Sequence, residues 1–376
     1  MKNKCFFFSL AVIFLLVSCW PQPPILIGFA GQLSGKQSEL GTQGRDGALL
    51  AVETINANGG VNGRRLQMLV EDDLGTPEGA AAVDQTLIDK KVVVIIGHMT
   101  SNATLGGLKV TEPAKMIMLS PTTSSSELTG LDDYFLRVQS DTGMMGRVMA
   151  EYAYSEDHLR TVACIYDIDN AAYTTSYLRE FERVFTALGG KMTASVRFSA
   201  ASNPTFSTYL PELRQDNPQA LMIMASGLHT ALIAQSVRMD GWQTPLIGVG
   251  WAMGNTLVEN GGKAVEGMKI SQTYDPQSKN PAMIDFQTRF KERFGHDPIF
   301  AATQSYETVL VLAAALEKTG GSSTGLREAL LQIRNFPGLQ GNLTMDPYGD
   351  VLRTNFILAV QDGQFVPIKQ VDPEQP

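Results

Sequence analysis

Short apolar runs alternate with helical segments along most of the chain after residue 24. The first four apolar runs are typical of buried parallel strands: "ILIGFAGQL", "RLQMLVEDD", "VVVIIGHM" and "MIMLSPTT". Between them, residues 44–60 and 76–91 have helical patterns; glycines end the first, and Thr76-Pro77 opens the second. This order predicts βα units that build one parallel sheet.

A second series of the same kind follows "YFLRVQSD" at residues 134–141, with the runs "TVACIYDID", "KMTASVRFS", "ALMIMAS" and "TPLIGVG". A further strand at 268–275, two helices around 283–295 and 305–320, and a β-rich tail come after it. No low-complexity linker separates the two series, which favours ordered crossings near residues 140, 270 and 346. We therefore expect an α/β protein with lobe I at 25–140 plus 271–346 and lobe II at 141–270 plus 347–376.

Length and composition agree with two globular lobes. The chain has 376 residues, 44% of them hydrophobic, which is enough apolar material for two cores. Its formal net charge is −8, and Lys and Arg form no cluster. A surface that binds nucleic acid would need such a cluster, so no nucleic-acid partner is expected.

The N-terminus has the order of an export signal: the basic "MKNK", the apolar "CFFFSLAVIFLLV" and then "LVSC" at 16–19. The last stretch resembles a lipobox, in which the cysteine thiol receives a diacylglyceryl group. We expect residues 1–18 to be a lipoprotein signal peptide, Cys19 to be lipidated, and residues 19–24 to form the linker of a membrane-anchored protein. A plain secretory signal and an uncleaved anchor are the alternatives.

Hydroxyl side chains follow two of the predicted strands, in "GHMTSN" at 97–102 and "SPTTS" at 120–124. In an open α/β sheet, ligands bind beyond the carboxyl ends of the strands, and helix N-termini favour anions. These residues therefore form a candidate ligand cradle. Ordinary helix caps and turns would give the same residue types, so the pattern alone leaves both interpretations open.

Enzyme motifs are incomplete or missing. The stretch "GVGWAMG" has its third glycine one residue late for a dinucleotide fingerprint, and "GQLSGK" is one residue short of a P-loop. No G-x-S-x-G or H-E-x-x-H motif occurs, and the four histidines are scattered without metal spacing. We expect neither catalysis nor a cofactor or metal.

The chain resembles the type I periplasmic binding proteins of the leucine/isoleucine/valine-binding class. The resemblance covers nearly all of the mature chain and rests on residues 27–73, "VVVIIGHMTSNAT", "MLSPTTSSSELT", "YFLRVQSD" and "DPYGDV". It implies two Rossmann-like lobes, joined by three hinge crossings, that close on a small ligand and deliver it to the permease of an ABC transporter. It also implies a monomer. A ligand-sensing receptor subunit on the same fold is the alternative.

The resemblance also implies which residues hold the ligand. Thr100, Ser101, Thr123 and Ser124 match the loops that bind a ligand carboxylate through hydroxyls and backbone N–H groups. A carboxylate only accepts hydrogen bonds, so such donors suit it. Pocket-wall positions match Leu40, Met99, Tyr173 and Trp251; Tyr173 aligns only with one inserted residue, and Leu40 stands where relatives often have an aromatic residue.

One departure changes the expected ligand. Relatives that bind amino acids have an acid in the loop matching "GVGWAMGN", where it pairs with the α-ammonium, and this loop has no Asp or Glu. We therefore expect a carboxylate ligand whose α-ammonium is recognised weakly or not at all. Asp141, Asp167 and Asp169 are the acids that would replace the missing one, and with them leucine-like amino acids stay an alternative.

Overall fold

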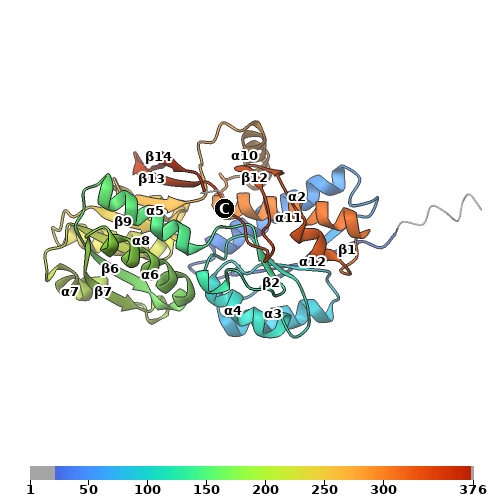
Figure 1. Cartoon of the computed structure of the whole chain (residues 1–376), viewed down its shortest axis with the longest axis horizontal. Coiled ribbons are helices and arrows are strands. Elements are labelled where there is room, and N and C mark those ends of the chain that lie inside the picture. The colour runs from blue at the N-terminus through green and yellow to red at the C-terminus, as the bar shows by residue number, and fades with distance from the viewer. Residues whose placement is uncertain (1–21, 374–376) are drawn as a thin grey trace, which may run out of the picture.

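The structure of the protein is a computed structural model that describes residues 22–373. The predicted signal peptide (1–18), Cys19 and all of the 19–24 linker except residues 22–24 lie outside the described residues. Within 22–373, no helix is both long enough and apolar enough to span a membrane. Figure 1 shows two halves side by side, each with its own sheet and helices.

The first sheet has five parallel strands in the order β2-β1-β3-β4-β5. Its strands are β1 (Ile25–Gly31), β2 (Leu66–Asp72), β3 (Ile95–Ile96), β4 (Met118–Ser120) and β5 (Phe135–Arg137). The strands β3, β4 and β5 are buried on both faces, as expected for a parallel sheet covered by helices. The helices of this half are α2 (Glu39–Ala57), α3 (Pro77–Asp89), α4 (Ser101–Thr111), α10 (Pro281–Phe294), α11 (Phe300–Thr319) and α12 (Leu326–Leu331). A short hairpin of β11 (Phe336–Gly338) and β12 (Gly341–Leu343) follows α12.

The second sheet has seven strands in the order β14-β13-β10-β9-β8-β6-β7. Five strands are parallel: β6 (Thr161–Asp167), β7 (Lys191–Phe198), β8 (Ala220–Met224), β9 (Leu246–Val249) and β10 (Lys269–Gln272). The last two, β13 (Asn355–Gln361) and β14 (Gln364–Val371), are antiparallel. The helices are α5 (Thr142–Ser155), α6 (Ala171–Ala187), α7 (Leu210–Arg214), α8 (Gly227–Met239) and α9 (Asn255–Gly261).

Two local features explain how the first half packs. The Thr76 hydroxyl accepts the Gly79 N–H (3.0 Å) and so caps α3, whose first residue is Pro77, as the sequence predicts. The helices α2 and α11 meet where α2 has Gly47, since a Cβ there would lie 2.0 Å from the Ala302 carbonyl oxygen. The helix α11 is buried on nearly all sides and forms the centre of this half.

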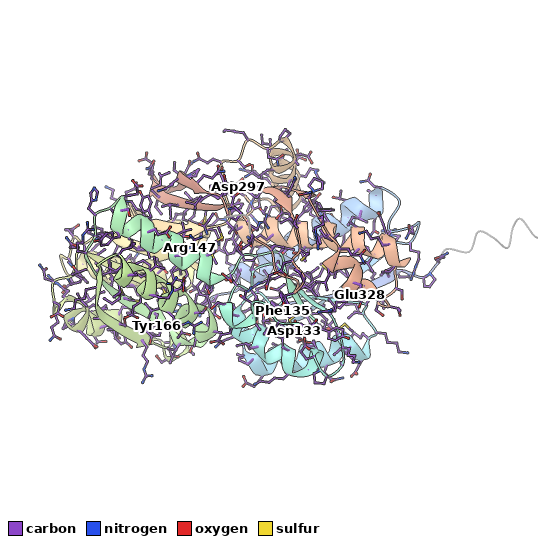
Figure 2. The ribbon with its side chains drawn as sticks, viewed as in Figure 1. Asp133, Phe135, Arg147, Tyr166, Asp297 and Glu328 are labelled. Carbon is purple, nitrogen blue, oxygen red and sulfur yellow. The ribbon has the colours of Figure 1, made fainter. Side chains whose placement is uncertain are left out.

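The chain passes between the halves three times: at residues 138–141, after β10 and before β13. The two-lobed α/β architecture expected from the sequence is confirmed. The predicted division at residues 140, 270 and 346 stays a prediction; β10 belongs to the second sheet as far as Gln272, and Val351 still pairs with Met345 in the first half. In Figure 2, Arg147 and Tyr166 mark the second half, and Asp133, Phe135 and Glu328 mark the first.

Candidate ligand site

A cavity lies between the two lobes and encloses about 330 Å³ of space between atoms, part of it open to solvent. Its walls come from both lobes and from the first two crossings. The lining residues are Leu40, Met99, Thr100, Ser101, Thr122, Ser124, Gln139, Met145, Asn170, Tyr173, Trp251, Gln272 and Phe300. Seven of the eight residues predicted to contact a ligand are among them; Thr123 is the exception.

The loop after β3 brings Met99, Thr100 and Ser101 to the cavity. Thr100 is the N-cap residue of α4, but its hydroxyl makes no capping hydrogen bond. In the described part of the chain this hydroxyl has no other partner, so it is free to bond a ligand. Ser101 is buried, and its Oγ accepts the Ser125 N–H at 3.2 Å. The two loops are thereby tied together at the N-terminus of α4.

The loop after β4 divides its hydroxyls between structure and cavity. The Thr123 hydroxyl donates to the His98 carbonyl (3.1 Å) and lies 2.7 Å from the Thr104 hydroxyl, so it faces the interior of the lobe. Thr122 lines the cavity but donates to the Met99 carbonyl (2.7 Å). The Ser124 hydroxyl has no partner among the described residues and is available to a ligand.

The opposite wall is apolar and aromatic. Trp251 follows β9 in a 3-10 turn (Gly250–Ala252) and lies edge-on to Tyr173, with 6.0 Å between ring centroids and an interplanar angle of 70°. The Trp251 N–H donates to the Tyr173 hydroxyl oxygen at 3.4 Å. Leu40 and Phe300 complete this wall from the first lobe. Such a surface suits a hydrocarbon or aromatic group.

Sequence reasoning missed six lining residues: Thr122, Gln139, Met145, Asn170, Gln272 and Phe300. Gln139 and Gln272 both lie where a strand leads into a crossing, and both are buried. Each of these two glutamines is an uncharged polar residue at the end of an apolar strand, and this pattern could have predicted them as lining residues. Met145 and Phe300 come from helix starts that the hydrophobic pattern does not connect to the site.

None of the thirteen lining residues is charged. The three acids proposed as alternatives are used elsewhere. Asp141 accepts the Met144 N–H (3.0 Å) and caps α5, Asp167 accepts the Asp169 N–H (3.0 Å), and Asp169 accepts the Ser199 hydroxyl (2.8 Å). Burial raises the pKa of Asp167 to about 6. Within residues 22–373, no group of three His, Cys, Asp or Glu side chains could hold a metal ion.

A buried ion-pair cluster, formed by His98 with two aspartates, supports the loop after β3. His98 is fully buried, with Nδ1 2.6 Å from an Asp73 oxygen and Nε2 3.1 Å from an Asp84 oxygen. Burial disfavours the charged imidazole, but the charge of Asp84 and the hydrogen bonds to both acids outweigh it and raise the pKa of His98 to about 9. The His98 carbonyl accepts the Ser120 (2.9 Å) and Thr123 hydroxyls, which fixes the second loop against the first.

A family model described as a periplasmic binding protein matches residues 24–364. The chain belongs to the periplasmic binding protein family. Members of this family bind solutes, so the protein is a binding protein and not an enzyme. The family name also implies a place outside the cytoplasm.

Three similar proteins agree with this periplasmic binding protein assignment. The leucine-, isoleucine-, valine-, threonine- and alanine-binding protein of Pseudomonas aeruginosa is 26% identical over 337 residues, which cover 88% of each chain. A leucine binding protein of Thermotoga maritima has a TM-score of 0.86 and 26% identity, covering 93% of this chain and 99% of that one. A solute binding protein of Rhodopseudomonas palustris in complex with 3,4-dihydroxybenzoic acid has a TM-score of 0.83 and 22% identity, covering 93% and 97%. The resemblance found in the sequence is confirmed.

In this periplasmic binding protein, hydrogen bonds cross the cleft beside the cavity. Asn102 on α4 makes three of them: its N–H donates to Asn170 Oδ1 (3.1 Å), its Nδ2 donates to the Asp169 carbonyl (2.8 Å), and its Oδ1 accepts the Ala172 N–H (2.9 Å). All three partners lie at the start of α6 or in the turn before it. The lobes are thus held together at one edge of the site.

Two further contacts cross the cleft elsewhere. Arg179 Nη2 donates to the Ser126 hydroxyl (3.0 Å), and the Thr256 N–H donates to Glu39 Oε1 (3.1 Å). Each contact joins a helix of one lobe to a different segment of the other. The binding protein therefore has its lobes in contact on both sides of the cavity.

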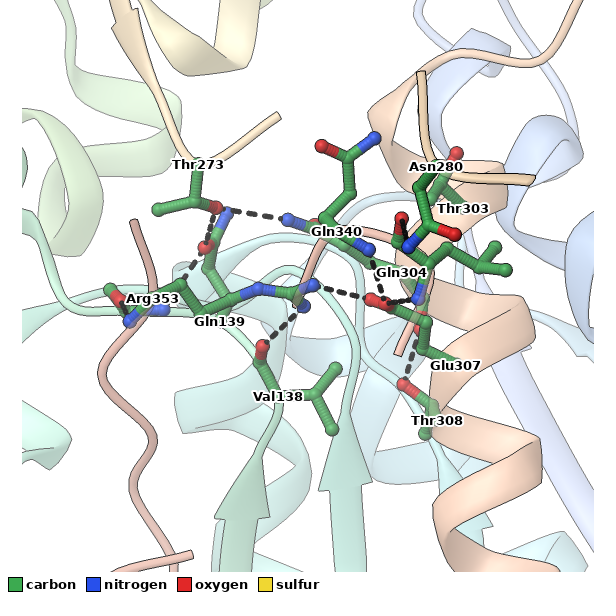
Figure 3. Close-up of polar contacts among 12 residues, drawn as sticks. Val138, Gln139, Thr273, Asn280, Thr303, Gln304, Glu307, Thr308, Gln340 and Arg353 are labelled. Carbon is green, nitrogen blue, oxygen red and sulfur yellow. Dashed lines mark hydrogen bonds and ion pairs between the residues drawn. The ribbon is translucent and has the colours of Figure 1, made fainter. Parts of the chain in front are cut away.

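The crossings of the binding protein are joined by a buried polar network (Figure 3). Arg353, just before β13, donates to Glu307 of α11 (2.6 Å) and to the Val138 carbonyl (3.0 Å). Glu307 also accepts the Leu339 N–H at 2.6 Å. The Gln139 Nε2 donates to Gln272 Oε1 at 3.1 Å. The first crossing is thereby bonded to both of the others.

Proposed function

We propose that the protein is the substrate-binding lipoprotein of an ABC transporter, which captures a small carboxylate ligand in the cleft and delivers it to a membrane permease. The observation that carries the ligand class is the cavity itself. Unpaired hydroxyls lie at one end, an aromatic and apolar wall faces them, and no lining side chain is charged.

The proposed carboxylate partners are Thr100 and Ser124, with Ser101 at the N-terminus of α4. Both free hydroxyls are donors, and the helix N-terminus adds backbone N–H groups and a positive partial charge. Hydrogen bonds to a charged group are worth about 1.5–3 kcal/mol each. We assign Thr123 a supporting role, because its hydroxyl bonds the His98 carbonyl instead.

The ligand proposed here lacks an α-ammonium group. Burying an ammonium without a paired charge costs several kcal/mol, or about two orders of magnitude in affinity at least. Of the three similar proteins described above, two are named for amino acids, and one was solved with 3,4-dihydroxybenzoic acid. An uncharged cavity with Trp251 and Tyr173 in its wall favours the second kind of ligand, or a branched aliphatic acid.

Mass spectrometry of compounds released from freshly purified, denatured protein tests this proposal first. Calorimetric titration then compares leucine with 4-methylpentanoate and phenylalanine with 3-phenylpropanoate. We expect the deaminated acids to bind more tightly. Tight binding of the amino acids alone would refute the proposed lack of ammonium recognition.

A double variant tests the carboxylate partners. Thr100→Val with Ser124→Ala should weaken binding of the preferred acid by roughly a hundredfold or more, because two charge-assisted hydrogen bonds are lost. Ser207→Ala, an exposed serine of the second lobe, is the matched control and should leave affinity unchanged. If the double variant binds as tightly as the control, the carboxylate lies elsewhere.

Transport is tested in cells. Deletion of the gene should abolish high-affinity uptake of the labelled acid, and a copy of the gene should restore it. Unchanged uptake, with loss of a transcriptional or motile response to the acid, would favour a sensing subunit instead.

A further inference from the structure

Besides the hydroxyls of the proposed carboxylate site, three hydrogen-bond donors of the cavity have no acceptor in the described part of the chain: the amides of Gln272 and Asn170 and the hydroxyl of Tyr173. We infer that they select a ligand with an oxygen acceptor, a carbonyl or hydroxyl oxygen, in addition to its carboxylate. The inference rests on the proposed carboxylate-binding function and names the second group of the ligand. Gln272 is its main determinant.

The orientation of the Gln272 amide is fixed by its oxygen. Gln272 ends β10 and is only 2% exposed. Its Oε1 accepts the Thr273 N–H at 2.7 Å and the Gln139 Nε2–H at 3.1 Å. A flipped amide would place donor against donor at both contacts. The Nε2 group must therefore be the one left for the cavity.

The amide of Gln139 cannot flip either, because its oxygen also accepts hydrogen bonds from the protein. Gln139 Oε1 accepts the Ser140 N–H at 3.0 Å and the hydroxyl hydrogen of Thr273. Only its Nε2 can then face Gln272. The direction of the whole chain of amides follows from the backbone N–H of Ser140, which is always a donor.

Gly250 makes room for the free end of Gln272. A Cβ on Gly250 would lie 2.6 Å from Gln272 Nε2 and 3.0 Å from Cδ, so any side chain there would displace the amide. Gly250 directly precedes Trp251 of the cavity wall. The donor therefore lies beside the aromatic wall, in the second lobe.

In the other two side chains, as in Gln272, the oxygen accepts a hydrogen bond from the protein. Asn170 is 4% exposed, and its Oδ1 accepts the Asn102 N–H (3.1 Å), which leaves Nδ2 as the free group. The oxygen of Tyr173 accepts the Trp251 N–H, which leaves the hydroxyl hydrogen. Each side chain accepts a hydrogen bond within the protein and keeps an unpaired donor.

A ligand satisfies these donors only with an acceptor. A buried donor without a partner is unfavourable, so a second oxygen on the ligand gains affinity that a plain hydrocarbon acid cannot gain. An ammonium group has only donors, so it would place its N–H groups against the N–H groups of the protein. The shared chemistry is a carboxylic acid with a further oxygen, as in a 2-oxo acid or a ring-hydroxylated aromatic acid.

Calorimetry on the intact mature protein distinguishes these sources. One set compares 4-methyl-2-oxopentanoate, 4-methylpentanoate and leucine; the other compares 3,4-dihydroxybenzoate with benzoate. We expect the oxygenated acid of at least one set to bind roughly tenfold tighter than its plain counterpart. The set that shows the preference identifies the source. Equal affinities in both sets would overturn the inference.

Two variants test the role of Gln272. Gln272→Met keeps the length of the side chain but removes the donor, so the preference for the oxygenated acid should fall to about one. Gln272→Glu puts an acceptor where the donor was. It should weaken the oxygenated acid by about a hundredfold and strengthen leucine relative to it. Gln277→Met and Gln277→Glu, at an exposed glutamine, are the controls and should keep the wild-type ratio.

Affinity ratios within one variant are insensitive to a modest loss of folding, because both ligands report on the same folded fraction. An unchanged ratio in Gln272→Met would overturn the inference while the carboxylate proposal stands. Binding of none of the acids by the wild-type protein would instead overturn the proposed function, and the inference with it.

Discussion

Arg353 and Glu307 form a charged pair that is nearly inaccessible to solvent. Glu307 is fully buried and Arg353 is 5% exposed, with 2.6 Å between the bonded atoms. Removing one partner of a buried pair leaves the other charge without compensation, which costs about 3–5 kcal/mol. Glu307→Gln should therefore lower the free energy of unfolding in urea by about this amount. Glu317→Gln, an exposed glutamate on the same helix, should change it little.

The buried His98 predicts a pH dependence of stability. Its pKa is about 9 in the folded protein and about 6.5 unfolded, so the folded state binds this proton more tightly. The stabilisation is complete below about pH 6.5 and is lost as the pH rises through about 9. We expect the free energy of unfolding to fall over this range by on the order of a few kcal/mol.

Urea titrations at pH 6, 7.5 and 9 measure this change. His98→Asn should be less stable at pH 6 and should show a much flatter profile between pH 6.5 and 9. His158→Asn, an exposed histidine, serves as the control and should retain the wild-type slope. Parallel profiles for wild type and His98→Asn would contradict the assignment of the slope to this residue.

At the scale of elements, we expect the contact between α4 and the start of α6 to control closure. Asn102 makes three hydrogen bonds of 2.8–3.1 Å across the cleft, two of them through its side chain, and the side chain bonds nothing in its own lobe among the described residues. Each is worth about 0.5–1.5 kcal/mol net. Asn102→Ala should weaken ligand binding by roughly ten- to a hundredfold and leave the unfolding midpoint of the ligand-free protein nearly unchanged.

The control for this variant is Asn260→Ala, at an exposed asparagine on α9 whose side chain bonds only within its own helix. Calorimetry and thermal melts on the same samples separate the two effects. If Asn102→Ala lowered the melting temperature of the ligand-free protein as strongly as it lowered affinity, the contact would be a part of the fold and not of closure.

Hydrophobic pattern predicted most elements but not all of their bounds. The run "VVVIIGHM" is eight residues long, yet β3 is only Ile95–Ile96, although the Val93 N–H already bonds the Leu26 carbonyl of β1. The helix α5 was missed because glycines at 143 and 146 interrupt its pattern. Asp141, an alternative partner for a ligand ammonium in the sequence, uses its side chain to cap that helix.

The candidate site was predictable where it depends on one strand and the loop after it. The hydroxyl loops follow β3 and β4, and parallel strands bring their carboxyl ends to one edge. Gln139 and Gln272 were not predictable in this way, because they meet only where two crossings lie side by side. Periodicity carries no information about that contact. Thr123 is a different case. It lies in the predicted loop, but the sequence does not reveal that its hydroxyl faces the interior of the lobe.

At the scale of the whole molecule, we expect a hinge motion about the three crossings. The lobes contact each other through a few hydrogen bonds at separate points, so separation requires no disruption of either core. Small-angle scattering should give a smaller radius of gyration when the preferred acid is present at saturation. Leucine at the same concentration, if it does not bind, is the control. Identical profiles would argue against closure on the ligand.

The whole protein is also expected to be tethered to a membrane. The basis is the sequence "LVSC", whose Cys19 lies outside the described residues. Cys19→Ala should yield an unprocessed precursor or a soluble exported protein, detected by fractionation and intact-mass measurement. Cys5→Ala, inside the predicted signal peptide, should leave the lipidated mass unchanged. An acylated Cys19→Ala product would disprove the assignment.

The chain of hydrogen bonds from Ser140 through Gln139 to Gln272 also bears on the rates at which ligands bind and dissociate. Its direction depends on a contact between two crossings, and the donors of Asn170 and Tyr173 belong to the second lobe. A ligand that first docks on the hydroxyl loops of the first lobe meets none of them until the lobes come together. Competing acids should then associate at similar rates and differ chiefly in how long they stay bound. The protein would then select among acids by how slowly each one dissociates, after the acid has first bound to the first lobe.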